Sequence, residues 1–164
     1  MLRFFHNPLL VAKLAEYDYL IKGNKKQSTA EYKIKRIIKD VTGEVFEDIE
    51  VYNSGLSIPK ITKNGFQATA IYIPELNELL VIYRGSESED ISDWFYNYTG
   101  IVSGENTSQI DSACKFIKFL KRKIVDFDSC YKVAAGHSLG GHIAITVELL
   151  KQIYQRVYTF NTAL

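Results

Sequence analysis

One short segment limits the folds open to this chain, and it reads Gly136-His137-Ser138-Leu139-Gly140-Gly141. It lies between a run of β-favouring residues, 131–135, and a run with helical apolar spacing, 139–153. A chain that turns sharply from a strand into a helix needs small residues beside the turn, because Cβ atoms would collide there. Gly136 and Gly140 lie two positions before and two positions after Ser138, so the pattern predicts a strand, a tight elbow and a helix.

The same segment has the form in which serine hydrolases present a nucleophile. A hydroxyl is a poor nucleophile at neutral pH, so a catalytic serine is held at an exposed, strained point where a base can reach it. Ser138 is therefore the candidate nucleophile, and the backbone N–H of Leu139 is the first candidate donor to an oxyanion. Chance occurrence in a glycine-containing turn is the alternative, but the strand before and the helix after favour the elbow.

Two histidines lie close to the candidate nucleophile in the sequence. His137 precedes it in an extended segment, so we expect its side chain to point away from the serine hydroxyl. His142 lies one helical turn further on, and we interpret it as a structural histidine, since a catalytic base must contact the hydroxyl. Neither histidine completes a triad.

The remaining elements follow from hydrophobic periodicity. Helical spacing predicts helices over residues 8–20, from residue 28 to a glycine at 43, and over 108–125. Residues 44–65 are ambiguous. Strands are predicted for 66–73 and 79–83, as an antiparallel pair, and for 156–160. The alternation of strands and helices predicts an α/β fold with a mostly parallel sheet flanked by helices, a helical N-terminal segment over 1–60, and a single domain over 1–164.

Two motifs together resemble the class 3 lipases, a family of α/β-hydrolases. Residues 135–141 are similar to the nucleophile motif of that family, and residues 81–86, followed by Asp93-Trp94, are similar to its strand and oxyanion loop. The resemblance covers residues 66–164. It implies that Ser86 supplies a second oxyanion donor opposite Leu139, whereas physical reasoning alone leaves Ser86 as a simple turn serine. We interpret Asp93 and Trp94 as residues that anchor the loop.

The same resemblance implies an activity and a substrate class. A member of this family hydrolyses an ester or lipid substrate through an acyl-enzyme, here on Ser138, and it needs no metal and no organic cofactor. An acyltransferase or peptidase reaction at the same nucleophile is an alternative. Acyl-chain specificity does not follow from these motifs.

The sequence departs from the family pattern after the elbow. In α/β-hydrolases the acid and then the histidine follow the serine along the chain. Residues 139–164 contain no aspartate and no histidine other than His142. We therefore expect an incomplete α/β-hydrolase domain whose base and acid come from beyond Leu164, from a complementing chain or by self-association. The alternative is a non-catalytic fragment, kept as a binding or regulatory remnant.

Composition and charge narrow the classes of partner. The 20 basic and 19 acidic side chains leave a net charge of +1, which gives no electrostatic reason to expect a nucleic acid partner. The two cysteines, Cys114 and Cys130, are too few for a metal site and are expected to be small buried apolar residues. No apolar run reaches the roughly 20 residues of an integral membrane segment, and no cleaved signal is evident, so we expect a cytoplasmic protein.

Overall fold

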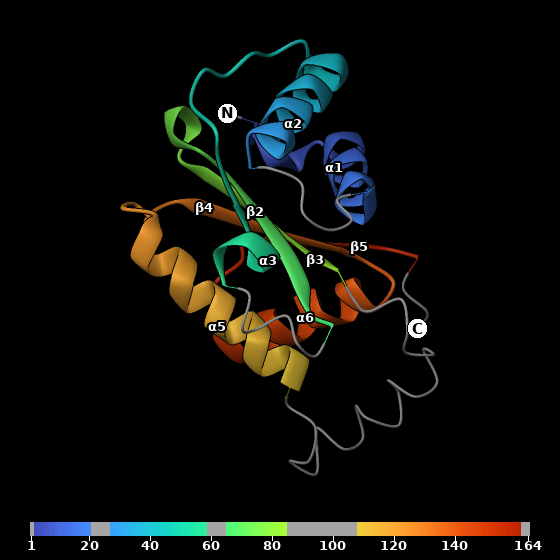
Figure 1. Ribbon diagram of the computed structural model, residues 1–164, viewed down its shortest axis with the longest axis vertical. Coiled ribbons are helices and arrows are strands. Elements are labelled where there is room, and N and C mark those ends of the chain that lie inside the picture. Colours follow the sequence, from blue (N-terminus) through green and yellow to red (C-terminus); the bar gives the residue numbers. More distant parts are fainter. Residues whose placement is uncertain (1, 21–26, 59–64, 85–107, 162–164) are drawn as a thin grey trace.

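The computed structural model describes residues 2–20, 27–58, 65–84 and 108–161, which form one sheet with helices on both sides (Figure 1). In chain order the elements are η1 (Phe4–His6), α1 (Pro8–Leu20), α2 (Gln27–Thr42), β1 (Glu50–Asn53), α3 (Ser54–Ser57), β2 (Gln67–Ile73), η3 (Pro74–Leu76), β3 (Glu78–Arg84), α5 (Ser108–Lys123), β4 (Tyr131–His137), α6 (Leu139–Lys151) and β5 (Arg156–Phe160).

The sheet is mixed rather than mostly parallel. Its strands lie in the order β1-β2-β3-β4-β5. β2 is antiparallel to both β1 and β3, whereas β4 is parallel to both β3 and β5. The expectation of a mostly parallel sheet is therefore wrong. The reason is β1, which the sequence did not predict and which adds a second antiparallel pair beside the expected hairpin of β2 and β3, closed by η3 and a left-handed Asn77 (φ 50°).

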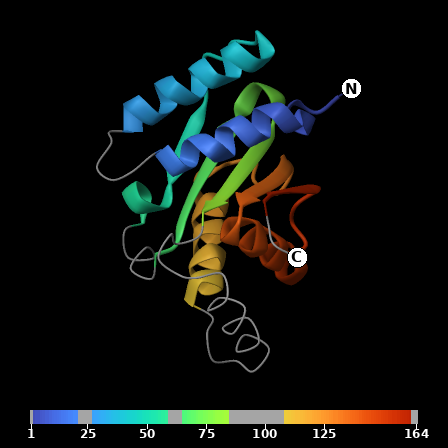
Figure 2. The same cartoon turned by 90° about the vertical axis from the view of Figure 1, so that its right-hand side faces the viewer.

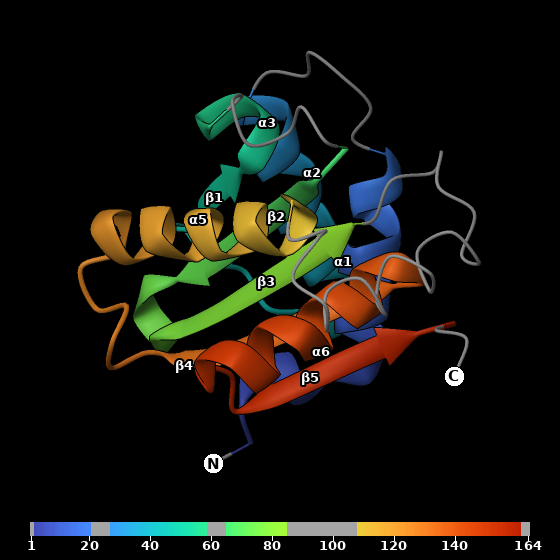
Figure 3. The ribbon, with the colours of Figure 1, turned by 90° about the horizontal axis from the view of Figure 1, so that it is seen from below.

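The parallel half of the sheet contains the predicted βαβ units. α5 connects β3 to β4, and α6 connects β4 to β5, with both helices on one face (Figure 3). β4 continues two residues beyond the predicted end at residue 135, up to His137. α6 ends earlier than predicted, at Lys151, because Gln152 adopts a left-handed conformation (φ 50°) and donates its N–H to the Glu148 carbonyl at 2.8 Å.

The helices divide the apolar core into two layers. α1 and α2 cover one face of the sheet and α5 and α6 cover the other (Figure 2). Tyr83 and Leu79 of β3 pack with the α5 and α6 side, whereas Leu80 and Ile82 pack with the α1 and α2 side. This alternation follows from the two-residue period of a strand. Because both faces are covered, every residue of β3 is buried.

The N-terminal segment is helical only in part. The helices predicted from residues 8 and 28 are present, and the Asn7 side chain caps α1 by accepting the Leu10 N–H at 3.1 Å. Gly43, with φ 77°, follows the end of α2 as predicted. The expectation of a helical segment up to residue 60 is wrong at β1, which pairs with β2 and buries Val51. None of the described helices has the length and apolar character required to cross a bilayer.

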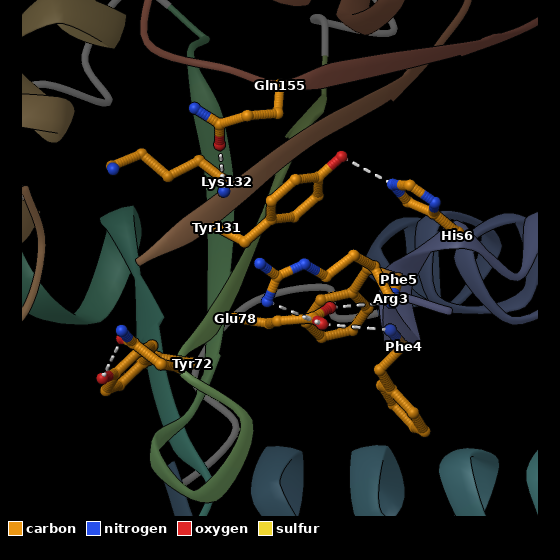
Figure 4. A network of polar contacts seen from close by, with 10 residues as sticks. Arg3, Phe4, Phe5, His6, Tyr72, Glu78, Tyr131, Lys132 and Gln155 are labelled. Atoms are coloured by element: carbon orange, nitrogen blue, oxygen red, sulfur yellow. Dashed lines mark hydrogen bonds and ion pairs between the residues drawn. The ribbon is translucent and has the colours of Figure 1, made fainter. Parts of the chain in front are cut away.

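The start of the chain is fixed to the amino-terminal edge of the sheet by a buried carboxylate (Figure 4). Glu78 begins β3 and accepts the backbone N–H groups of Phe4 and Phe5, each at 3.1 Å. Its carboxylate also lies 3.8 Å from the Arg3 guanidinium. Beside it, His6 Nε2 lies 2.6 Å from the hydroxyl of Tyr131, at the start of β4. These contacts place η1 at the end of the sheet opposite Ser138.

Candidate active site

Ser138 lies at the junction of β4 and α6, with a backbone conformation that is rare for an L-residue. Its φ is 53° and its ψ is −122°. Its N–H donates to the carbonyl of Phe160, the last residue of β5, at 2.9 Å, and its own carbonyl accepts the Gly141 N–H at 3.0 Å. A strained conformation of this kind costs about 1–3 kcal/mol and persists only where the surroundings enforce it. The predicted elbow is therefore present in the backbone.

Gly136 and Gly140 are required by the close approach of three backbone segments. A Cβ atom added to Gly136 would lie 2.2 Å from the carbonyl carbon and oxygen of Gly140. A Cβ atom added to Gly140 would lie 2.0 Å from the carbonyl oxygen of Tyr83 in β3. The obstructing atoms are backbone atoms, which cannot rotate away. The two glycines thus allow α6 to begin directly against the ends of β3 and β4, as the sequence predicted.

α6 begins directly after the elbow residue Ser138. Leu139 is the first residue of the helix, and the first N–H groups of a helix have no acceptor within it. The side chain of Ser138 does not cap the helix, so it does not occupy this end. Ser138 itself is half-buried. The N–H of Leu139 and the hydroxyl of Ser138 therefore come from adjacent residues at the carboxyl edge of the sheet.

The three histidines of the chain lie in different places. His6 contacts Tyr131 at the opposite edge of the sheet. His137 Nε2 lies 3.1 Å from the side-chain amide nitrogen of Asn161, just after β5. His142 is half-buried in the first turns of α6, and its carbonyl accepts the Thr146 hydroxyl at 2.8 Å. The rings of His6 and His137 thus contact Tyr131 and Asn161.

The second oxyanion donor inferred from the resemblance, Ser86, lies outside the described residues, as do Asp93 and Trp94. β3 is described up to Arg84, whose register partner in β4 is His137. Arg84 is buried and donates from its guanidinium to the side-chain carbonyl of Gln67 at 3.1 Å. The strand that leads towards Ser86 therefore ends beside the elbow, at the same edge of the sheet.

Two buried tyrosines support the elbow from the α5 and α6 side. The hydroxyls of Tyr83 and Tyr154 lie 2.5 Å apart. Burial raises the pKa of both phenols, so both stay protonated near neutral pH. Tyr83 also supplies the carbonyl that Gly140 approaches. The pair thus connects β3 to the segment between α6 and β5.

The cysteines have the structural character that the sequence predicted. Cys130 is buried, and Cys114 is partly buried against the α5 and α6 core. Burial is the main cause that raises the pKa of each thiol, which disfavours the reactive thiolate. Within the described ranges there is no group of three or more metal-ligating side chains.

Sequence reasoning missed a cavity beside the elbow. It has a volume of about 470 Å³ and is lined by Ala12, Ala15, Glu16, His137, Phe160 and Asn161. The residues from α1 and from the end of β5 are far apart in the sequence, and neither set forms a motif. Only the sequence position of His137, next to Ser138, could have pointed to this place.

Comparison with known proteins assigns the chain to a family. A domain of unknown function, DUF6792, matches residues 9–164. The chain belongs to the DUF6792 family. This DUF6792 domain is also similar to the uncharacterized protein YvcB of Bacillus subtilis (strain 168), with 30% identity over 172 residues. That match covers 90% of the chain but only 26% of YvcB, so the chain spans about a quarter of its relative's length. No solved structure matches this DUF6792 domain.

Proposed function

We propose that this DUF6792 domain acts as a serine hydrolase of carboxylic esters and forms an acyl-enzyme on Ser138. The observation that carries the proposal is the strained backbone of Ser138, held where Gly136 and Gly140 let α6 approach β3 and β4. Strained residues cluster at active sites because the strain fixes a reactive group in place. We also propose that the fold is an α/β-hydrolase fold like that of the class 3 lipases.

The proposed chemistry uses the two adjacent groups at the carboxyl edge. The Ser138 oxygen attacks the ester carbonyl carbon while a general base takes the hydroxyl proton. The carbonyl oxygen becomes an oxyanion, which the Leu139 N–H stabilises together with Ser86 as second donor. The carbon–oxygen bond to the alcohol then breaks, and the alcohol leaves with the proton. Water repeats the attack on the acyl-enzyme and releases the acid.

The proposed reaction needs a general base for the Ser138 hydroxyl, and the rings of His6 and His137 contact Tyr131 and Asn161 instead. We propose that the base and the acid come from a complementing chain, from self-association, or from polypeptide beyond Leu164 in a longer form of the protein. His142 is the candidate within the chain, because it lies one helical turn from Ser138. A serine hydrolase without its histidine retains about 10³–10⁴ of acceleration from the oxyanion hole and binding.

A second candidate function is a non-catalytic binding module. The placement of the histidines favours it, since His6 lies at the opposite edge and the His137 ring contacts Asn161. In this case the elbow would be kept for its backbone geometry alone. The two candidates differ in the reactivity of the Ser138 hydroxyl.

Labelling with a fluorophosphonate tests the proposal, because the reagent reports an activated serine without assuming a substrate. With the base supplied by self-association at high protein concentration or by a longer form of the protein, we expect labelling that is lost in Ser138→Ala. Ser129→Ala is the matched control, since the Ser129 hydroxyl donates to the Asp126 carbonyl in an exposed turn far from the elbow. A folded chain that resists labelling, alone and at high concentration, would contradict autonomous catalysis and favour the binding module. If labelling requires His142, that residue is the base.

A further inference from the structure

A cavity lies between α1 and the carboxyl ends of β4 and β5, and two of its lining residues are bonded to Ser138. His137 lines the cavity and is bonded to Ser138 through the peptide link. Phe160 also lines it, and its carbonyl accepts the Ser138 N–H at 2.9 Å. His137 and Phe160 are register partners, at the last paired position of β4 and β5. The cavity therefore lies next to the backbone of the elbow, at the end of the sheet where α/β proteins bind ligands, while Ser138 is not itself one of the lining residues.

The lining combines apolar and polar side chains. α1 contributes Ala12 and Ala15, whose short side chains leave space above the sheet. The Phe160 ring faces the same side, since it packs against the α1 and α2 core layer. Polar groups come from Glu16, which is exposed, and from the contact between His137 and Asn161. A volume of about 470 Å³ lies within the range of small-molecule sites, which are mostly apolar with a few polar groups.

Another cavity of similar size lies elsewhere and lacks this relation to Ser138. Its volume is about 500 Å³, and its lining includes Arg3, Phe4, Leu76 and Glu78, at the amino-terminal edge of the sheet. There the carboxylate of Glu78 is already occupied by the N–H groups of η1. An ester bound at that edge would lie at the wrong end of β4 for attack by Ser138.

We propose that the cavity lined by Ala12, Ala15 and Phe160 binds the apolar acyl group of the ester substrate. α1, which lies outside the predicted lipase-like core, thereby determines acyl-chain selectivity. This inference rests on the proposed function for its substrate class. The physical requirement is space, because a larger side chain at Ala12 would fill the volume that the acyl chain needs.

Binding of methyl octanoate to the Ser138→Ala chain tests the inference without turnover. Nuclear magnetic resonance of the alanine methyl groups gives the local readout. We expect saturable shifts of the Ala12 and Ala15 methyl signals, while the Leu76 methyl signals, at the other cavity, stay unchanged. In the same background, Ala12→Trp should weaken binding on the order of tenfold or more, since a contact of one or two methylenes in an apolar pocket is worth that much.

Two further variants keep the test decisive. Leu9→Trp is the matched control, because Leu9 lies on α1, is 58% exposed and does not line the cavity. Ala12→Leu is a smaller change that should weaken binding less than Ala12→Trp, and circular dichroism checks that each variant folds. Unchanged affinity in both Ala12 variants, or no shift of the Ala15 methyl with the parent chain, overturns the inference.

The fluorophosphonate experiment separates this inference from the proposed function. Binding at Ala15 without labelling of Ser138 would reject the hydrolase and retain an apolar ligand site. Labelling of Ser138 without binding at Ala15 would retain the hydrolase and reject the cavity as its acyl site. In the enzyme, Ala12→Trp should lower the labelling rate with a long-alkyl fluorophosphonate more than with a short one.

Discussion

Ser138 is one of four non-glycine residues with positive φ among those described, and it alone combines φ 53° with ψ −122° at a helix start. Because of this strain, we expect glycine to be more stable than alanine at position 138, the reverse of the usual order in a helix. Ser138→Gly should be more stable than Ser138→Ala by about 1 kcal/mol, because glycine adopts positive φ without a Cβ clash, less the entropy it adds to the unfolded chain. Urea denaturation of the two variants measures the difference.

At a control site in an ordinary helix, we expect alanine rather than glycine to be the more stable substitution. Lys118 lies on the exposed side of α5, within an ordinary helix. There Lys118→Gly should be less stable than Lys118→Ala by about 1 kcal/mol, since glycine is a poor helix former. If glycine also proved the less stable choice at position 138, the backbone of Ser138 would not be strained in solution.

The close packing around Gly140 predicts the effect of adding a side chain there. Gly140→Ala should destabilise the fold by about 3 kcal/mol or more, because its Cβ would lie 2.0 Å from the Tyr83 carbonyl oxygen and force α6 away from β3. Gly43→Ala is the control, with φ 77° and no atom within 4 Å of the added Cβ, and should cost only about 1 kcal/mol. Equal losses of unfolding free energy at the two positions would argue against the close approach of α6.

At the scale of elements, the sequence predicted what is local and periodic. The helices at α1, α2, α5 and α6 extend over several turns, so their apolar spacing is visible, and the hairpin of β2 and β3 has its turn within the sequence. β1 was missed because four residues are too few to show a period. The glycines predicted the tight elbow at Ser138, whereas the cavity walls in α1 and β5 depend on long-range packing that leaves no motif.

The link between Tyr83 and Tyr154 predicts a response at the scale of elements. Tyr83→Phe or Tyr154→Phe should each cost about 1–3 kcal/mol, because the remaining hydroxyl stays buried without its partner. The double variant should cost less than the sum of the two, since no hydroxyl is then left without its partner. A double-mutant cycle by urea denaturation measures the coupling, with Tyr32→Phe on the exposed side of α2 as the neutral control.

The same pair predicts how stability depends on pH. Burial raises the pKa of both phenols above 10, so the folded chain holds these protons where the unfolded chain releases them. Stability is therefore unaffected by the pair below pH 10 and falls as the pH rises above it. The double phenylalanine variant should lose less unfolding free energy between pH 9 and pH 11 than the parent. An equal loss would mean that the two tyrosines ionise in the folded state without cost.

At the scale of the whole molecule, the two ends of the sheet differ in what occupies them. The carboxyl edge holds Ser138 and the cavity under α1. The amino-terminal edge is occupied by η1, which Glu78 holds in place and which leads directly into α1. Because α1 both covers the sheet and forms a cavity wall, the attachment of η1 to Glu78 contributes to the position of a wall at the far end.

The same arrangement predicts that the hydrogen bond of the Ser138 amide survives when η1 is released from Glu78. Glu78→Ala should cost about 2 kcal/mol or more, because it leaves the N–H groups of Phe4 and Phe5 without their acceptor, whereas Glu78→Gln, which keeps one carbonyl oxygen, should cost less. Hydrogen exchange at the Phe5 amide should accelerate, while the Ser138 amide, bonded to Phe160, stays protected. Asp40→Ala, which removes an exposed pair with Arg36, should change stability by less than about 0.5 kcal/mol. If Ser138 lost its protection together with Phe5, the elbow would depend on the N-terminal segment, and the sheet would unfold as one unit from either end.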